Sequence, residues 1–325
     1  ALRTVLSELN RYGLTGVHDT GVTHETVALY KDLADDDELN VRVYVMLADE
    51  EETLNAFDEP FVGYGDERLD VRSVKLYADG ALGSRGAALL EPYDDAPDSS
   101  GLLFAERDAL ISKIAAANAK GFQVGVHAIG DRANRVTLDA FESVQGDAPS
   151  QLRNRIEHAQ VVSLEDIPRF AELGLIASMQ LTHATSDMNM AEDRVGPERI
   201  RGAYAWQRFL ENGVVLAAGS DFPVEATNPF WGIYSGVTRQ DHRGEPAGGW
   251  YPEQRLSIAE ALHAFTLGAA YAGHAEDSLG SLEPGKWADF VLIDRDPFTG
   301  DPSELWQTIV LETWLAGEPV YRRHR

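Results

Sequence analysis

The stretch FQVGVHAIGDRANRVTLDAFESV (122–144), with RNRIEHA (153–159) after it, decides the fold. A β-branched apolar run ends in His127, an amphipathic segment follows, and a second strand-like run ends in His158. The two histidines are 158 − 127 = 31 residues apart, which is about one strand-plus-helix unit. This order predicts parallel strands joined by helices.

The same alternation extends in both directions along the chain. Amphipathic helices are expected at 106–121, 131–144, 163–174, 198–213 and 257–273. Seven strands are expected, at 14–19, 41–47, 71–77, 122–128, 153–159, 175–180 and 214–221. A further amphipathic helix (1–13) opens the chain, so we expect an α/β fold, a (β/α)8 TIM-like barrel whose first strand is missing. A seven-stranded open sheet is the alternative.

Polar residues at the ends of these strands are the candidate site. Lys75 lies near the end of VRSVKLY, and Asp221 follows VVLAAGS, while His127 and His158 end the two strands described above. Side chains at the carboxyl ends of parallel barrel strands converge on one mouth. Such a set can hold a divalent metal and activate a water molecule. The chain has no cysteine, so thiolate ligands and disulfides are excluded.

Three long connections are expected on the same face, at 78–105, 181–197 and 222–256, where insertions shape substrate pockets. In the first, Asp79 and Arg85 are candidates for orienting a polar substrate group, and a loop-internal ion pair is the alternative. In the second, His183 is a candidate substrate or transition-state contact, against a simple turn histidine.

The sequence pattern changes after the last expected helix. Residues 274–325 contain SLGSLEPGKWADFVLIDRD and TIVLETWLAGEPVYRR, which read as short antiparallel strands with turn residues between them. We therefore expect two parts, a barrel over 1–273 and a small β-appendage over 274–325.

The charge balance excludes some classes of partner. The 53 acidic and 28 basic residues give a net charge of −25, which disfavours nucleic acid and anionic membranes. The favoured interpretation is a halophilic surface, and a cationic substrate is the alternative. No apolar run has the length of a membrane helix and no secretory signal opens the chain, so we expect a cytoplasmic protein.

The ordered motifs resemble amidohydrolase family 3, the branch that includes N-substituted formamide deformylases. The resemblance covers almost the whole chain and rests on VKLYADGALGSRGAAL, GVHAIGDRA, RIEHAQ, MQLTHATSDM, AYAW, GSDFPVEATNPFWGIYSGVTRQD and GSLEPGKWADFVLID. It implies a metal-dependent (β/α)8 hydrolase with a β-sandwich built from both chain ends. It also implies that His127 and His158 bind metal, that Asp221 ends the last barrel strand, and that Lys75 is the lysine that is often carboxylated between two metals.

One departure from the family pattern concerns its H-x-H pair, which lies on the first strand. No H-x-H occurs in this sequence, so the chain is expected to be a fragment or a single domain. Glu157 precedes His158, and because adjacent strand residues face opposite sides we do not expect it to support that histidine.

The expected function is hydrolysis of a non-peptide C–N bond, in an amide or formamide, with Asp221 as general base. Urea-like or cyclic amide substrates are the alternative, as is a non-catalytic chain that lacks the H-x-H ligands. The expected cofactor is one or two divalent ions, zinc first, with Mn, Fe or Co also suited to such ligands. The expected partner is a small-molecule amide, and exposed sheet edges favour a homo-oligomer.

Overall fold

The computed structural model describes residues 2–146 and 149–324. Seven parallel strands form one curled sheet in the order β1-β2-β4-β5-β6-β7-β8, and the short β3 (Phe61–Gly63) pairs antiparallel with β4. Their bounds are β1 (Gly16–Val22), β2 (Arg42–Ala48), β4 (Leu69–Tyr77), β5 (Gln123–Ala128), β6 (Arg155–His158), β7 (Ile176–Gln180) and β8 (Leu216–Gly219). All seven predicted strands are present.

The sheet is a half-barrel with alternating helices rather than a closed ring. Its path ends at β1 on one side and β8 on the other, and within the described residues no ladder joins these two strands. The core strands β2 and β5 are apolar and buried along nearly their whole length, as expected when helices cover a parallel sheet. The fold class predicted from the sequence is therefore confirmed.

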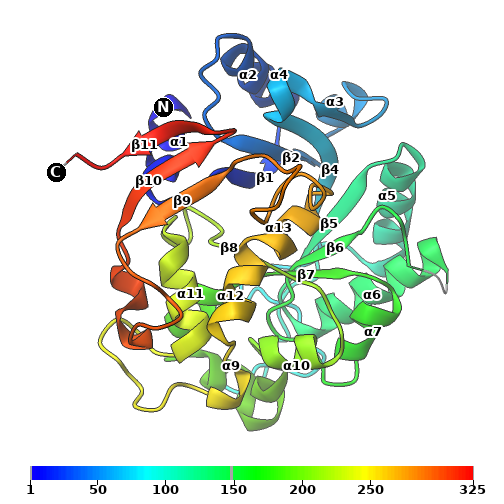
Figure 1. The fold of residues 1–325 in the computed structure, drawn as a ribbon. Helices are drawn as coiled ribbons and strands as arrows, with labels where there is room; N and C mark the ends of the chain where they lie inside the picture. Colours follow the sequence, from blue (N-terminus) through cyan, green and yellow to red (C-terminus); the bar gives the residue numbers. More distant parts are fainter. Residues whose placement is uncertain (1, 147–148, 325) are drawn as a thin grey trace.

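The helices surround the sheet in Figure 1, and α12 and α13 lie against β8. The α-helices are α1 (Leu2–Arg11), α2 (His24–Asp35), α3 (Glu51–Asn55), α4 (Tyr64–Glu67), α5 (Arg107–Ala119), α6 (Asp131–Gln145), α7 (Ile167–Glu172), α8 (Leu181–Asp187), α9 (Ala191–Arg199), α10 (Trp206–Glu211), α11 (Pro229–Thr238), α12 (Ile258–Phe265) and α13 (Leu267–Ala272). Three 3-10 helices are η1 (Ile200–Gly202), η2 (Pro252–Gln254) and η3 (Pro302–Gln307). No helix in these parts of the chain is both long and apolar enough to cross a membrane.

Three expectations about helices need correction. The connection 181–197 holds α8 and the start of α9, and 222–256 holds α11. The helix expected over 198–213 is interrupted between η1 and α10, where Tyr204 has a left-handed φ of 48° that a continuing helix does not allow. The helix expected over 163–174 is only α7, with a proline in its first turn.

The C-terminal segment forms a separate antiparallel sheet, as predicted. Its strands are β9 (Phe290–Ile293), β10 (Val310–Leu315) and β11 (Glu318–Arg322), in the order β11-β10-β9. Figure 1 shows these orange and red strands beside the blue helix α1, and Thr313 Oγ1 donates a 2.6 Å hydrogen bond to the Asn10 carbonyl. Arg42 at the start of β2 binds both carboxylate oxygens of Asp289, at 2.7 and 3.1 Å.

Candidate active site

The strand register brings the predicted residues to the carboxyl end of the sheet. Tyr77 of β4 pairs with His127 of β5, and Ala128 pairs with His158 of β6. The ring centroids of His127 and His158 are 4.5 Å apart in an edge-to-face arrangement. His183, on α8 directly after β7, stacks on His158 with a centroid distance of 6.0 Å. The three histidines therefore form one cluster.

The His158 ring is held by its neighbour on β7. Its Nδ1 lies 2.7 Å from Gln180 Oε1, which is an acceptor, so Nδ1 carries the proton and Nε2 keeps its lone pair. Metal-binding histidines are commonly oriented through the second nitrogen in this way. Burial, with His127 and Lys75 adding to it, holds the pKa of His158 well below its usual value.

The other two rings carry buried nitrogens without a partner. Nε2 of His127 and Nε2 of His183 are both buried and make no hydrogen bond. Burial lowers the pKa of each ring to about 4, and the charge of Lys75 contributes at His127. Both imidazoles are thus neutral at pH 7, the form in which histidine binds a metal. A cation or a polar substrate group would satisfy the two free nitrogens.

Lys75 lies on β4 two residues before Tyr77, and it pairs with Gly125 two residues before His127. Its side chain is buried. Burial lowers the pKa of its ammonium to about 8; the carboxylate of Glu157 opposes this shift, Arg155 adds to it and Asp221 opposes it. Nζ also lies 5.0 Å from the centroid of the Tyr77 ring. At pH 7 the ammonium form therefore still predominates, but the neutral amine is far more populated than in a surface lysine.

Glu157 also lies in this region, because it pairs with His127 in the β5–β6 ladder. Its buried side chain is 2.5 Å from Arg155 Nε and influences Lys75, His127 and Asp221 electrostatically. His158, the next residue, reaches the same region because its backbone turns into the left-handed conformation, with φ 76°, and departs from strand alternation. No sequence signal marks that turn.

Asp221 lies at the exposed rim beyond β8, in a left-handed conformation with φ 56°. Desolvation raises the pKa of its carboxyl group, Lys75 opposes this and Glu157 adds to it. His127, His158 and Asp221 do not meet as a compact set, because among the described residues only His24, Glu25 and Glu52 bring three such ligand atoms within 4.8 Å of one another. That trio, with His24 half-buried and both glutamates exposed, lies at the starts of α2 and α3, where carboxylates are favoured without an ion.

The side chains of Asp79 and Arg85 are both engaged by the protein itself. The buried carboxylate of Asp79 accepts hydrogen bonds from the backbone N–H groups of Ala88, Ile129 and Gly130, at 2.8 to 2.9 Å. Its Oδ1 lies 3.5 Å from His127 Nε2. Arg85 makes a two-pronged pair with Asp95, at 3.0 and 2.9 Å. Asp79 thus ties the loop after β4 to the loop after β5.

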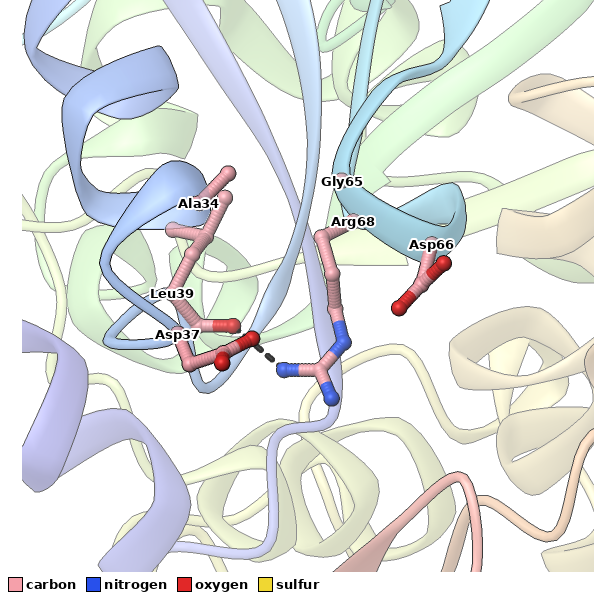
Figure 2. A pocket seen from close by; sticks show the side chains of 6 residues that line it. All are labelled: Ala34, Asp37, Leu39, Gly65, Asp66 and Arg68. Atoms are coloured by element: carbon pink, nitrogen blue, oxygen red, sulfur yellow. Dashed lines mark hydrogen bonds between the residues drawn. The ribbon is translucent and has the colours of Figure 1, made fainter.

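A small pocket of about 100 Å³ lies at the opposite end of the sheet. Figure 2 shows its lining around Arg68, which donates to the Leu39 carbonyl at 2.5 Å, with Asp37 and Asp66 nearby. These residues precede β2 and β4, whereas the histidine cluster follows β5, β6 and β7. The candidate active site therefore lies away from this pocket.

Comparison with known proteins identifies relatives of this chain. The sequence model of the amidohydrolase family matches residues 1–321. The chain is similar to the putative amidohydrolase YtcJ of Bacillus subtilis (32% identity, covering 99% of this chain and 61% of that protein). It is also similar to the N-substituted formamide deformylase of Arthrobacter pascens (26% identity, covering 99% and 60%).

The fold comparison gives a similar result. A crystal structure of an uncharacterized metal-dependent hydrolase from Pyrococcus furiosus superposes with a TM-score of 0.81 at 33% identity, over 92% of this chain and 60% of that one. The chain spans about three fifths of the length of each of these proteins. The match of the family's sequence model over nearly all residues shows that the chain belongs to the amidohydrolase family.

Proposed function

We propose that this site serves metal-dependent hydrolysis of a non-peptide C–N bond, in an amide or formamide. The observation that carries the proposal is the cluster of three neutral histidines, two of them with unpartnered buried nitrogens, beside Lys75 at the carboxyl end of the sheet. The name of the Arthrobacter pascens relative supports a formamide-type substrate. Urea-like and cyclic amides share the same bond type and remain the second candidate class.

The donor types present suit a divalent ion, which would have to bring Asp221 and the two histidines closer together than they lie here. His127 Nε2 makes no hydrogen bond, although Asp79 Oδ1 lies 3.5 Å away, and His158 Nε2 is left free by the Gln180 contact. These nitrogens are the first ligands proposed, with Lys75 and Asp221 completing the set. When bound, such an ion polarises a carbonyl and lowers the pKa of a water molecule. Imidazole and carboxylate donors favour zinc and also accept Mn, Fe or Co.

Lys75 is proposed to become a metal ligand through a reaction of its amine. A neutral amine can add to carbon dioxide, forming an N–C bond and releasing one proton, which turns a cationic side chain into an anionic oxygen donor. The lowered pKa of about 8 makes the neutral amine accessible near neutral pH. Carboxylation of Lys75 is accordingly part of the proposal.

The remaining residues handle the proton and the substrate. Asp221, whose pKa is raised by desolvation, is proposed to accept a proton from the attacking water and return it to the leaving nitrogen. In its Nε2–H tautomer, His183 is proposed to donate a hydrogen bond from Nε2 to the substrate carbonyl or to the developing oxyanion. Asp79 lies beside His127 and binds the backbone of the loop that carries Arg85. Asp79 and Arg85 are therefore proposed to shape the substrate site by fixing the conformation of this loop.

Metal content is the first test of the proposal. Elemental analysis of the protein purified without chelator should find at least one equivalent of a transition metal, and His127→Ala should lose most of it. His263→Ala, at an exposed position on α12, is the matched control and should keep it. Equal metal content in the protein and in His127→Ala would refute the site.

Substrate class is the second stage of the same test. The metal-loaded protein is assayed with N-substituted formamides, with formate release as the readout, in parallel with ureas and cyclic amides. Formate release that disappears in His127→Ala supports the formamide proposal, whereas turnover of ureas or cyclic amides alone favours the second class. Bound metal without turnover of any C–N substrate would favour a non-catalytic chain.

A further inference from the structure

Glu157 and His158 are adjacent in sequence, yet both side chains lie at the site. A regular strand would send them to opposite faces. The structure brings them together through two consecutive left-handed residues, His158 with φ 76° and Ala159 with φ 42°. For residues other than glycine this conformation is unfavourable, because Cβ crowds the following carbonyl oxygen. Contacts from other elements must therefore hold this segment in place.

The next residue, Gln160, is the point where such contacts converge. Its buried side-chain amide donates to Asp187 Oδ2 at 3.1 Å and to the Tyr204 hydroxyl at 2.9 Å. The Tyr204 hydroxyl donates to the same Asp187 oxygen at 2.7 Å, and the Tyr204 N–H donates to the Gln160 carbonyl at 2.8 Å. Every hydrogen of the Gln160 amide and of the Tyr204 hydroxyl is thus used.

Asp187 is the acceptor that closes this network, and it lies on the same helix as His183. The two residues are four apart on α8, so they share a helix face. That face meets the end of β6 twice, through His183 stacked on His158 and through Asp187 bound to the Gln160 amide. The helix is therefore fastened to both sides of the left-handed turn.

We propose that Asp187 is a positioning residue for His158. Its carboxylate fixes Gln160 and Tyr204, which hold the His158–Ala159 turn, and the turn directs the imidazole of His158 toward His127 and His183. Asp187 touches neither the metal nor the substrate and acts only through His158. The expected effect on metal affinity rests on the proposed function. The positioning of His158 itself rests on the backbone geometry alone.

The test is a double-mutant cycle on metal affinity, with Zn²⁺ titrated into the metal-free protein and followed by calorimetry. Asp187→Ala should weaken binding about 10- to 100-fold, the range found when groups that orient a metal ligand are removed. Asp187→Ala added to His158→Ala should cause no further loss, because Asp187 acts only through that ring. Asp187→Asn keeps an acceptor oxygen and should restore most of the affinity.

Controls separate positioning from general loosening of α8. Thr185 lies on α8 as well, and Thr185→Val removes its 2.9 Å hydrogen bond to Ser235 Oγ of α11. This variant should leave metal affinity unchanged. If Asp187→Ala does not fold, Tyr204→Phe removes the hydroxyl from the network and should give a smaller loss with the same non-additivity. Equal losses in Asp187→Ala and Thr185→Val, or losses that add to that of His158→Ala, would overturn the proposal.

A metal-free readout keeps the two proposals distinguishable. In a crystal structure of metal-free Asp187→Ala, His158 and Ala159 should leave the left-handed region and the 2.7 Å contact between His158 and Gln180 should lengthen. If the unmodified protein binds no metal but this rearrangement occurs, the proposed function fails and the positioning role stands. An unchanged His158 backbone in that variant refutes the positioning role, whatever the metal result.

Discussion

Gly125 lies opposite Lys75 in the β4–β5 ladder, and its missing side chain makes room for two other residues. A Cβ at this position would collide with Met46 Cε and lie 2.7 Å from Glu157 Oε1. Met46 ends in a flexible thioether that can move aside, whereas the carboxylate of Glu157 is held by Arg155. The glycine therefore sets how closely Glu157 approaches Lys75.

We predict that Gly125→Ala destabilises the protein by about 1–3 kcal/mol, the usual cost of overpacking a full core. The added methyl group also displaces Glu157, so metal affinity should fall in parallel. Urea unfolding measures the first effect and metal titration the second. Gly16→Ala on β1 is the control, since its Cβ would meet only ordinary contacts at 3.7 Å and beyond, and equal destabilisation in both variants would contradict the prediction.

His183 gives the site a pH dependence whose sign follows from its burial. Desolvation lowers the pKa of its ring to about 4 in the folded protein, whereas the ordinary value is near 6.5. Between these values the unfolded chain binds a proton at this residue and the folded protein does not. Acidification from pH 6.5 to 4 therefore favours unfolding through this group.

We predict that His183→Asn reduces the loss of folding stability between pH 6.5 and 4. The stability of the unmodified protein should fall relative to the variant by up to about 1.4 kcal/mol per pH unit between pH 6.5 and 4. The measurement is urea unfolding at half-unit pH steps, with chelator present so that metal does not contribute. Only the difference in slope is interpreted, because the substitution also changes packing, and parallel curves would refute the prediction.

At the scale of elements, the strands were predictable and the turns between them were not. The run ending in His127 is apolar and β-branched because β5 is buried, and that composition is visible in the sequence. Helix α8 has no such signal, since LTHATSD is rich in residues of modest helix propensity and the helix packs on α11. His183 was therefore expected in a loop.

The grouping of side chains at the site was as predictable as the strands that carry them. Parallel strands bring their carboxyl ends together, so the grouping of His127 and His158 followed from their places in the pattern. The position of His158 beside Glu157 depends on a left-handed backbone at His158, which nothing in RIEHAQ specifies. That conformation is held by Gln160 contacts from α8 and from the segment before α10, which exist only in the folded chain.

For the whole molecule, the dominant feature is an unbalanced surface charge. With 53 acidic and 28 basic side chains, 53 − 28 = 25 negative charges remain in excess even if every basic charge is neutralised. The ion pairs of the described residues are mostly on the surface, where each contributes little. Repulsion among the excess carboxylates therefore outweighs attraction at low ionic strength.

We predict that the thermal midpoint rises between low salt and molar KCl. At 1 M salt the screening length is about 3 Å, against about 30 Å at 0.01 M, so the long-range repulsion is removed while contact pairs at hydrogen-bond distance lose less. Differential scanning calorimetry measures the shift. A variant with Glu50→Gln and Glu51→Gln, both exposed beside β2, carries two fewer negative charges and should show a smaller rise. A midpoint that stays level or falls with KCl would mean that the acidic surface is not an adaptation to salt, and the cationic-substrate explanation of the charge would then be the one to pursue.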